Sequence, residues 1–481
     1  MSRRTFALLF SGGCAALTTI SWVHSWPALA DGRPWSDLGG GRHSNPWLDI
    51  LQFATQSFLF ALYLAVLIQW RRLQLSPRTL AVMGIVPALL ALGTLPINSN
   101  DILYYVAMGR ILVVHGANPY THTYQEFPDD FSPYYGNQDL PLMYGPVSLP
   151  PLMLAAWLST TSFLLSIFAL KLVWLLVHLC SCVVLYGVLT RKGADAAFGL
   201  FLFGFSPLIL LEQVVNGHND GLMVLCGLLA IAAVQRGRAV GALLLALCAA
   251  FVKITGALFW AAILILLLRQ GEWRRAAVGT AACAGLVVLM AAVSFDDLNA
   301  ALAVANPGFW LRSTNSLHHL LIAFLAEYGP SLGASMEFSD IFAADRLVSG
   351  VLFLAFCVWR ATHIRTLESL VNEIAHLFLA FVVAFTPWFF PWYVTWLVPM
   401  AALTASERLR WTIVAYSGSV LSLYAFPRYV LTQAPFQQAW AGIRIIVAHA
   451  PVLTMVTKWV TEQASGPWRK ARRRFHFATP K

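Results

Sequence analysis

Residues 168–190 read FALKLVWLLVHLCSCVVLYGVLT and are followed by Arg191 and Lys192. A helix of about twenty mostly apolar residues is long enough to cross a hydrocarbon core roughly 30 Å thick. Similar runs recur along the 481-residue chain, in which 58% of the residues are hydrophobic and 11% are charged. A soluble domain has about 25% charged residues. The sequence therefore predicts an all-α, polytopic transmembrane helical bundle.

The apolar runs predict about 12–14 helices in a single transmembrane domain over residues 1–481. The candidate spans are 5–23, 48–70, 79–96, 168–190, 194–214, 218–235, 239–253, 256–268, 276–295, 347–360, 373–390, 393–405, 411–426 and 441–460. Short basic clusters mark cytoplasmic loops under the positive-inside rule, at 71–72, 191–192, 236–238, 274–275 and 408–410. Both termini are then inside, and residues 465–481 form a basic cytoplasmic tail suited to anionic lipid headgroups. The lipid bilayer accounts for the net charge of +10, so we expect no nucleic-acid partner.

Two interpretations remain for the N-terminus. Ser2-Arg3-Arg4, an apolar stretch and Ala28-Leu29-Ala30 fit a secretory signal with a cleavage site. A retained first helix with the same orientation fits equally well. In either case we expect residues 31–47 to lie outside.

A long polar insert interrupts the apolar pattern at residues 97–150. The apolar segment 147–165 that follows could cross the membrane, but a crossing would move Arg191, Lys192 and most later basic clusters to the outside. We therefore expect 97–167 to form one large outer loop with juxtamembrane helices. The stretch 149–168 would lie along or dip into the outer leaflet. A second outer loop is expected at 296–346.

Residues 239–268 lie between basic clusters and must enter and return. Thirty residues make two helices of about 15 residues, or roughly 22 Å each, which is too short for a full crossing. Backbone at such a depth is tolerated only beside a cavity or in protein contact. The sequence thus predicts a water-accessible cavity that opens outward, with Lys253 at its floor.

Asp101 follows Asn98-Ser99-Asn100, a set of good helix caps, and precedes a short stretch that we expect to be an amphipathic interfacial helix. One interpretation makes Asp101 a first-turn carboxylate favoured by the helix dipole. The other makes it a general base that accepts the proton of a substrate hydroxyl. Because the loop is long, polar and outward-facing, we favour the catalytic role.

Lys253 in an apolar hairpin costs roughly 2.5–3.5 kcal/mol unless it is paired or hydrated. A phosphate would offset that cost, and pairing with Asp220 or Glu212 is the structural alternative. His218 follows Gly217 at a helix start, which is a natural anion site, although Asn219 or Asp220 could simply cap that helix. Arg312 also suits a phosphate, or a carboxylate. The candidate phosphate ligands are therefore Lys253, Arg312 and His218.

The remaining candidates for sugar or acceptor contacts are Tyr105, Asn219, Asp220, His318, His319, Tyr393 and Glu126. Adjacent histidines on a helix point to different faces, so at most one should reach a site, and both could be structural. Tyr393 belongs to an aromatic cluster typical of an interfacial belt, with sugar stacking as the alternative. The acidic residues of the loop offer oxygen ligands for a divalent cation, but no spacing identifies a metal site. We predict no cofactor.

These motifs, in this order, resemble the integral-membrane glycosyltransferases of the GT-C superfamily. The chain is similar to their polyprenyl-phosphate-mannose-dependent mannosyltransferases, including family 87 and the bacterial α-1,6-mannosyltransferases. The resemblance spans most of residues 80–430. The matching residues are Asp101 with Tyr104-Tyr105 and Gly109-Arg110, Asn118-Pro119-Tyr120, Tyr144-Gly145-Pro146, Asn219-Asp220, Lys253 and Pro391-Trp392-Tyr393.

The resemblance implies a GT-C fold, a lipid-linked sugar-phosphate donor and a general base near the start of the first outer loop, which Asp101 matches. A second acidic residue of some relatives has no clear counterpart. We expect inverting transfer of a sugar, most simply mannose, from a polyprenyl phosphate to a hydroxyl of a glycan or glycolipid. The site would face outward from a bacterial inner (plasma) membrane. Arabinose or glucose as donor sugar and a protein acceptor stay open. A transporter or flippase of lipid-linked sugars is the rival, but we find no internal repeat typical of one.

Overall fold

The computed structural model describes residues 1–30, 46–135, 138–158, 160–295, 313–328, 338–424 and 434–475. These ranges are helical apart from connecting loops, and the β-structure found in them is one isolated bridge between Thr314 and Trp388. Seven of the described helices are long and apolar enough to cross a membrane, or eight if one pair bent by 44° is counted as a span. The predicted all-α, polytopic membrane architecture is confirmed.

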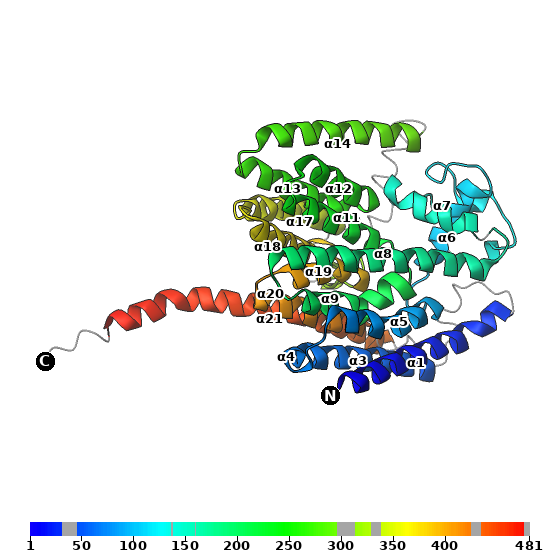
Figure 1. Ribbon diagram of the computed structural model, residues 1–481, viewed down its shortest axis with the longest axis horizontal. Coiled ribbons are helices and arrows are strands. Elements are labelled where there is room, and N and C mark those ends of the chain that lie inside the picture. The colour runs from blue at the N-terminus through cyan, green and yellow to red at the C-terminus, as the bar shows by residue number, and fades with distance from the viewer. Residues whose placement is uncertain are drawn as a thin grey trace.

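The long helices are α1 (Arg3–Ala30), α3 (Pro46–Ile68), α8 (Phe163–Lys192), α14 (Trp273–Ser294), α17 (Phe338–Ala361), α18 (Leu367–Ala380) with its π-helical extension η8 (Phe381–Phe385), and α21 (Ala434–Phe475). α8 and α14 run along the horizontal axis of Figure 1. α8 begins five residues before the expected 168, because Ser162 accepts a capping hydrogen bond from Leu165 N. α21 runs through much of the basic tail to Phe475.

Several of the fourteen expected spans are short or broken helices. They are α5 (Pro77–Gly93), α9 (Ala196–Gly204), α10 (Pro207–Ile209) with the π-helix η4 (Leu210–Val215), α11 (Asp220–Gln235), η9 (Pro391–Trp396) with α19 (Val398–Leu403), and α20 (Glu407–Ser419) with η10 (Val420–Tyr424). Pro207 and Pro391 begin new helical segments because proline lacks the N–H that would continue the preceding helix. Hydropathy alone does not separate a buried short helix from a span. In the second expected outer loop, α16 (Leu317–Tyr328) and the start of α17 are helical.

The predicted hairpin at 239–268 is present. α12 (Ala239–Val252) and α13 (Ala257–Arg269) have 14 and 13 residues, and Lys253 with the short helix η5 (Ile254–Gly256) forms the apex. A Cβ on Gly256 would lie 2.4 Å from the carbonyl group of Ala249. The return is therefore tight enough to require glycine, and it holds Lys253 at the turn.

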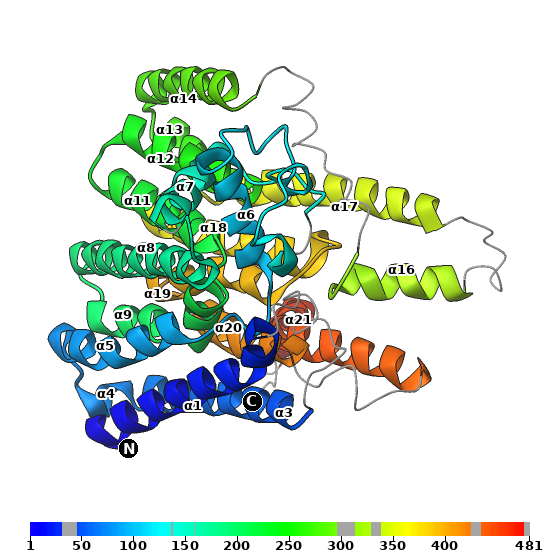
Figure 2. The same ribbon diagram turned by 90° about the vertical axis from the view of Figure 1, so that its right-hand side faces the viewer.

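The outer loop contains α6 (Asp101–Val113), η1 (Tyr124–Glu126), η2 (Ser132–Tyr134), η3 (Pro146–Ser148) and α7 (Leu149–Leu158). With ten residues, α7 is about 15 Å long, so it is too short to cross, as expected. α6 and α7 lie at one end of the molecule, opposite α4 (Trp70–Leu73) and the N-terminus (Figure 1). Seen from that end, they lie in front of the helical bundle (Figure 2).

The prediction that α6 is an amphipathic interfacial helix is wrong. Residues 102–111 are all buried. α7 and α8 pack on this helix, and tyrosines of the following loop, including Tyr120, Tyr124 and Tyr135, form a separate core with it. The bounds of the helix follow from its sequence, but its burial depends on a loop that folds back over it.

The buried side chain of Arg110 holds that loop in place through hydrogen bonds. Its guanidinium donates to Asp129 Oδ2 at 2.6 Å, to the Tyr124 hydroxyl at 3.2 Å and to the Thr160 carbonyl at 2.9 Å. It also lies 4.0 Å from the ring centroid of Phe131. Burial would raise the pKa of the Asp129 carboxyl, but the hydrogen bonds from Tyr124 and Arg110 outweigh it and hold that pKa below its usual 3.8.

We expect Arg110→Met to destabilise the protein by about 2–3 kcal/mol at neutral pH, because it leaves the Asp129 carboxylate, 18% exposed, without its cation. A carboxyl whose folded pKa is depressed stabilises the fold above its unfolded pKa, and that contribution is lost as the pH falls through the folded pKa. The difference in melting temperature in detergent should therefore shrink below about pH 4. Arg275→Met, which breaks an exposed pair with Glu272, should change little. An equal effect of both variants would contradict this role.

Candidate active site

A turn between η4 and α11 brings polar side chains to the start of α6. Gly217 has φ +72°, and a Cβ there would lie 2.5 Å from Ile102 of α6, so both the conformation and the close approach require glycine. The backbone N–H of His218 donates to the Glu212 carbonyl at 2.9 Å and closes the turn. This packing places His218 beside Asp101, the first residue of α6.

His218 lies between two carboxylates. Its Nδ1 is 3.6 Å from Asp101 Oδ2, and its Nε2 is 3.3 Å from Glu212 Oε2. The ring stacks on Trp392 with 4.0 Å between centroids. The side chain is fully buried, whereas that of Asp101 is 34% exposed. A phosphate at His218 would lie next to both carboxylates. The phosphate contact expected from the sequence stays a prediction.

Glu212 is held rigidly and is fully buried. Its carboxylate accepts hydrogen bonds from Asn216 Nδ2 at 3.1 Å and from the Tyr424 hydroxyl at 2.8 Å. Asn216 Oδ1 in turn accepts from the backbone N–H groups of Ile97 and Asn98, at the beginning of the outer loop. Glu212 therefore links η4, η10 and the outer loop. In the sequence analysis it was a candidate only as a partner for Lys253.

Lys253 pairs with Asp220, one of the two acidic partners considered for it in the sequence analysis. Lys253 Nζ donates to Asp220 Oδ1 at 2.8 Å, and Trp396 Nε1 donates to the same oxygen at 2.5 Å. Asp220 is fully buried, while Lys253 remains 14% exposed. The ammonium also lies 5.0 Å from the ring centroid of Tyr393 and 5.6 Å from that of Tyr144. Aromatic rings and one carboxylate thus surround a cation that still reaches the surface.

Tyr105 and Asn219 connect the outer loop to this pair. The Tyr105 hydroxyl lies 3.2 Å from the Tyr144 hydroxyl and 3.5 Å from Asn219 Oδ1, so its one proton can be donated to either oxygen. Asn219 makes no capping hydrogen bond at the start of α11; its Nδ2 donates to Ser148 Oγ at 3.5 Å. Burial raises the pKa of both tyrosines well above the usual value, and the charges of Asp101 and Asp220 add to the shift. Both hydroxyls are therefore neutral hydrogen-bonding groups at physiological pH.

Three other predicted site residues contact different partners. Glu126 belongs to a capping box with Thr123; hydrogen bonds from His122 and from that cap lower its pKa to about 2. His318 bonds Asp345 Oδ1 at 2.7 Å and the Ala384 carbonyl at 2.6 Å. His319 bonds Ser313 Oγ at 3.0 Å. As expected, the two histidines point to different surroundings. Arg312 lies outside the described residues.

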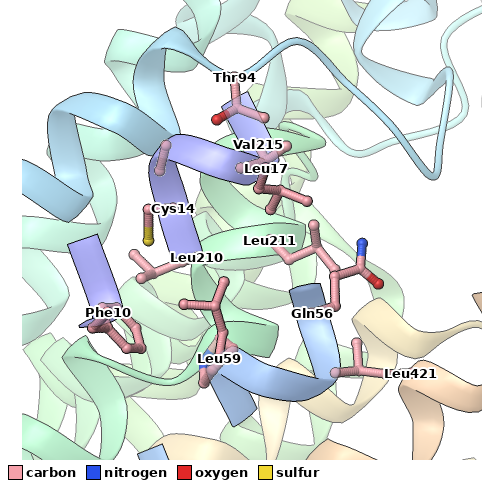
Figure 3. Close-up of a pocket in the computed structure, with 12 residues that line it drawn as sticks. Phe10, Cys14, Leu17, Gln56, Leu59, Thr94, Leu210, Leu211, Val215 and Leu421 are labelled. Carbon is pink, nitrogen blue, oxygen red and sulfur yellow. The ribbon is translucent and has the colours of Figure 1, made fainter. Parts of the chain in front are cut away.

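A mostly apolar pocket lies beside η4, on residues that flank Glu212 in the sequence. The pocket has about 450 Å³ of empty space, open solvent included, and lies among α1, α3, α5 and η4. Its wall is mainly apolar, with Leu211 of η4 and Gln56 of α3 among the lining residues (Figure 3). The wet cavity expected over Lys253 stays a prediction. Among the described residues, no group of three or more His, Cys, Asp or Glu side chains could hold a metal ion.

Two family models match the chain. The model described as Alpha-(1->6)-mannopyranosyltransferase, N-terminal domain, matches residues 12–269, more than half of the chain, and includes the Asp101, His218 and Lys253 positions. The MptB C-terminal domain model matches residues 322–456. No curated protein matches the sequence. The resemblance to GT-C mannosyltransferases is therefore confirmed: the chain belongs to the alpha-(1->6)-mannopyranosyltransferase family and is an integral-membrane mannosyltransferase.

Proposed function

We propose that the protein transfers mannose from a polyprenyl-phosphate donor to a hydroxyl of a glycan or glycolipid, with inversion and with Asp101 as general base. The observation that carries this role is that the three acidic side chains of the site differ in solvent exposure. Asp101 is 34% exposed, whereas Glu212 and Asp220 are fully buried and hydrogen-bonded. A general base must reach the hydroxyl whose proton it accepts, and among these three acids Asp101 has that access.

The backbone at Asp101 is held in place by its neighbours. Its backbone N–H donates to Ser99 Oγ at 3.2 Å, and the helix that follows is buried over ten residues. A base held in one place lowers the entropic cost of aligning the acceptor. In the proposed step, the acceptor oxygen attacks the anomeric carbon from the side opposite the phosphate, and the carboxylate takes the hydroxyl proton.

Lys253 would stabilise the phosphate that leaves. One of its ammonium protons is directed to Asp220, and the group retains 14% exposure for a further contact. A charge placed where negative charge develops is an effective form of transition-state stabilisation. Arg312 would add a second cation. Tyr393, which is partly exposed and whose ring centroid lies 5.0 Å from the ammonium, would contact the sugar, whereas buried Tyr105 and Asn219 would hold the outer loop against this pair. No part of the proposal depends on Glu126, His318 or His319.

The orientation of the protein in the membrane is inferred from a basic pair at one end and the large polar loop at the other. α6 and α7 lie at the end opposite α4 (Figure 1), which carries Arg71 and Arg72. Under the positive-inside rule the α4 end is cytoplasmic, so the site faces outward. In a bacterium this is the outer face of the inner (plasma) membrane.

Purified protein in detergent is expected to convert labelled polyprenyl-phosphate mannose and a glycolipid acceptor to mannosylated product, with one free polyprenyl phosphate per transfer. We expect transfer to persist with a chelator, and polyprenyl-phosphate glucose or arabinose to react more slowly. Detergent removes the two compartments that a transporter needs. Labelled lipid that crosses liposome membranes without any product in detergent would overturn the proposal in favour of a flippase.

A further inference from the structure

We propose that His218 accepts the proton that Asp101 takes from the acceptor, and that Glu212 holds the imidazole in the tautomer that this requires. The inference rests on the proposed function of Asp101 and assigns His218 a role other than phosphate binding. It makes Asp101 a base that is regenerated within the same turnover.

Distances and burial carry this inference. His218 has one carboxylate oxygen at 3.6 Å from Nδ1 and another at 3.3 Å from Nε2. Within the described part of the chain neither ring nitrogen makes a hydrogen bond, although the side chain is fully buried. A buried imidazole without a hydrogen bond is costly and calls for an explanation. Catalytic hydrogen bonds are often long without substrate and shorten in the reacting complex.

The two carboxylates differ in a way that sets the direction of proton transfer. Glu212 has no exposure, and both of its side-chain oxygens already accept hydrogen bonds, from Asn216 and Tyr424, so its Oε2 is placed to accept from an Nε2–H as well. An imidazole that donates from Nε2 presents its Nδ1 lone pair to Asp101. While neutral, such a ring can take a proton from protonated Asp101 but has no proton on Nδ1 to donate to it.

The step balances in atoms and charge. The acceptor O–H bond breaks, its oxygen bonds the anomeric carbon, and the bond from that carbon to the phosphate oxygen breaks with its electrons on the phosphate. The proton passes to Asp101 Oδ2 and then to His218 Nδ1. The imidazolium lies between two carboxylates, which stabilise it. Because His218 is fully buried, the proton later leaves through Asp101 to water or to the departing phosphate.

The other ionisable groups around His218 fit this assignment. Trp392 covers one face of the ring and carries no charge. The Tyr424 hydroxyl donates its proton to Glu212. The Asp220–Lys253 pair, two residues farther along α11, is internally neutralised at 2.8 Å. Asp101 and Glu212 are thus the two acidic side chains that pair with the His218 ring.

The test compares transfer kinetics across pH for the unsubstituted protein, His218→Gln and Glu212→Gln. We expect His218→Gln to lower kcat about 10- to 100-fold, to leave the donor KM within about twofold of the original because a relay residue adds no ground-state binding, and to move the acidic limb of the kcat profile to lower pH. Only Asp101 then needs to be deprotonated. Glu212→Gln should also move that limb to lower pH, because the imidazolium loses a carboxylate that stabilises it.

His122→Gln is the matched control, since it removes a histidine that also pairs with a glutamate, at 2.8 Å on the exposed loop. It should leave the limb unchanged. A raised donor KM in His218→Gln would indicate a phosphate ligand, and an unshifted limb would indicate a structural residue; either result overturns the relay.

If His218→Gln fails to fold, ¹⁵N-histidine NMR replaces it: Asp101→Asn should lower the titration midpoint of His218, and an unchanged midpoint rejects the proposal. An inactive Asp101→Asn beside a normal His218→Gln rejects the relay alone, whereas an active Asp101→Asn rejects the proposed function.

Discussion

Asp101→Asn is expected to lower kcat by about 10²- to 10⁴-fold, the range contributed by a positioned general base. Asparagine keeps the size and polarity of the side chain but cannot accept the proton of the acceptor hydroxyl. The carboxylate of Asp101 is 34% exposed and lies 3.6 Å from His218 Nδ1, beyond hydrogen-bond distance, so folding should not depend on it. Donor KM and the melting temperature should stay close to those of the original protein.

The control for this substitution is Asp130→Asn, which neutralises an exposed carboxylate in the same outer loop. It should leave transfer unchanged, which separates loss of the base from loss of negative charge at the outer surface. A folded Asp101→Asn protein that binds donor and transfers at the full rate would remove the catalytic assignment.

Substitution at Lys253 should have two effects that a double variant can separate. Lys253→Met alone removes the cation expected at the phosphate and leaves buried Asp220 without its partner at 2.8 Å. The lost contact should raise the donor KM about 10- to 100-fold, from the roughly 1.5–3 kcal/mol of a hydrogen bond to a charged group. Separately, the unpaired carboxylate of Asp220 should lower the free energy of unfolding by roughly 3–5 kcal/mol.

The double variant Lys253→Met with Asp220→Asn removes both charges. Trp396 can still donate to the amide oxygen at position 220, as it does to Asp220 Oδ1 at 2.5 Å. We therefore expect most of the melting temperature to return while the donor KM stays high, because stability depends on the pair and donor binding on the cation. Recovery of both would show that Lys253 only neutralises Asp220.

A second buried pair provides the matched control. Arg360 donates to Glu373 at 2.5 and 2.9 Å between α17 and α18, with 15% and 7% exposure. Arg360→Met with Glu373→Gln removes a comparable ion pair outside the cluster around Asp101. It should leave the donor KM unchanged. A similar rise in KM would mean that any buried pair perturbs donor binding through the general fold.

Local sequence patterns predicted the parts of the fold that depend on one segment at a time. The hairpin with Lys253 at its apex followed from basic clusters on both sides of a run too short to cross twice. The short α7 followed from the same rule applied to Arg191 and Lys192. Such predictions succeed because each helix must satisfy its own backbone hydrogen bonds and match its surface to lipid or protein.

Residues that depend on distant partners were identified less completely. Glu212, an acid within an apolar stretch, carried a signal because ionisable groups in such stretches are costly, but its hydrogen bond to Tyr424 joins residues 212 positions apart. The contact of Trp396 with Asp220 spans 176 positions and had no signal in the sequence. Arg110 matched a family motif, yet its contacts with Asp129, Tyr124 and Thr160 show that it holds the loop together.

By itself, the sequence determined that the chain is a helical membrane protein with a structured polar loop, because hydrophobicity and charge act on each segment separately. Only the tertiary structure decided that His218 lies between Asp101 and Glu212, that Lys253 pairs with Asp220, and that α6 is buried. These contacts join segments far apart in the chain. They depend on how helices pack, and no local property of the residues specifies that packing.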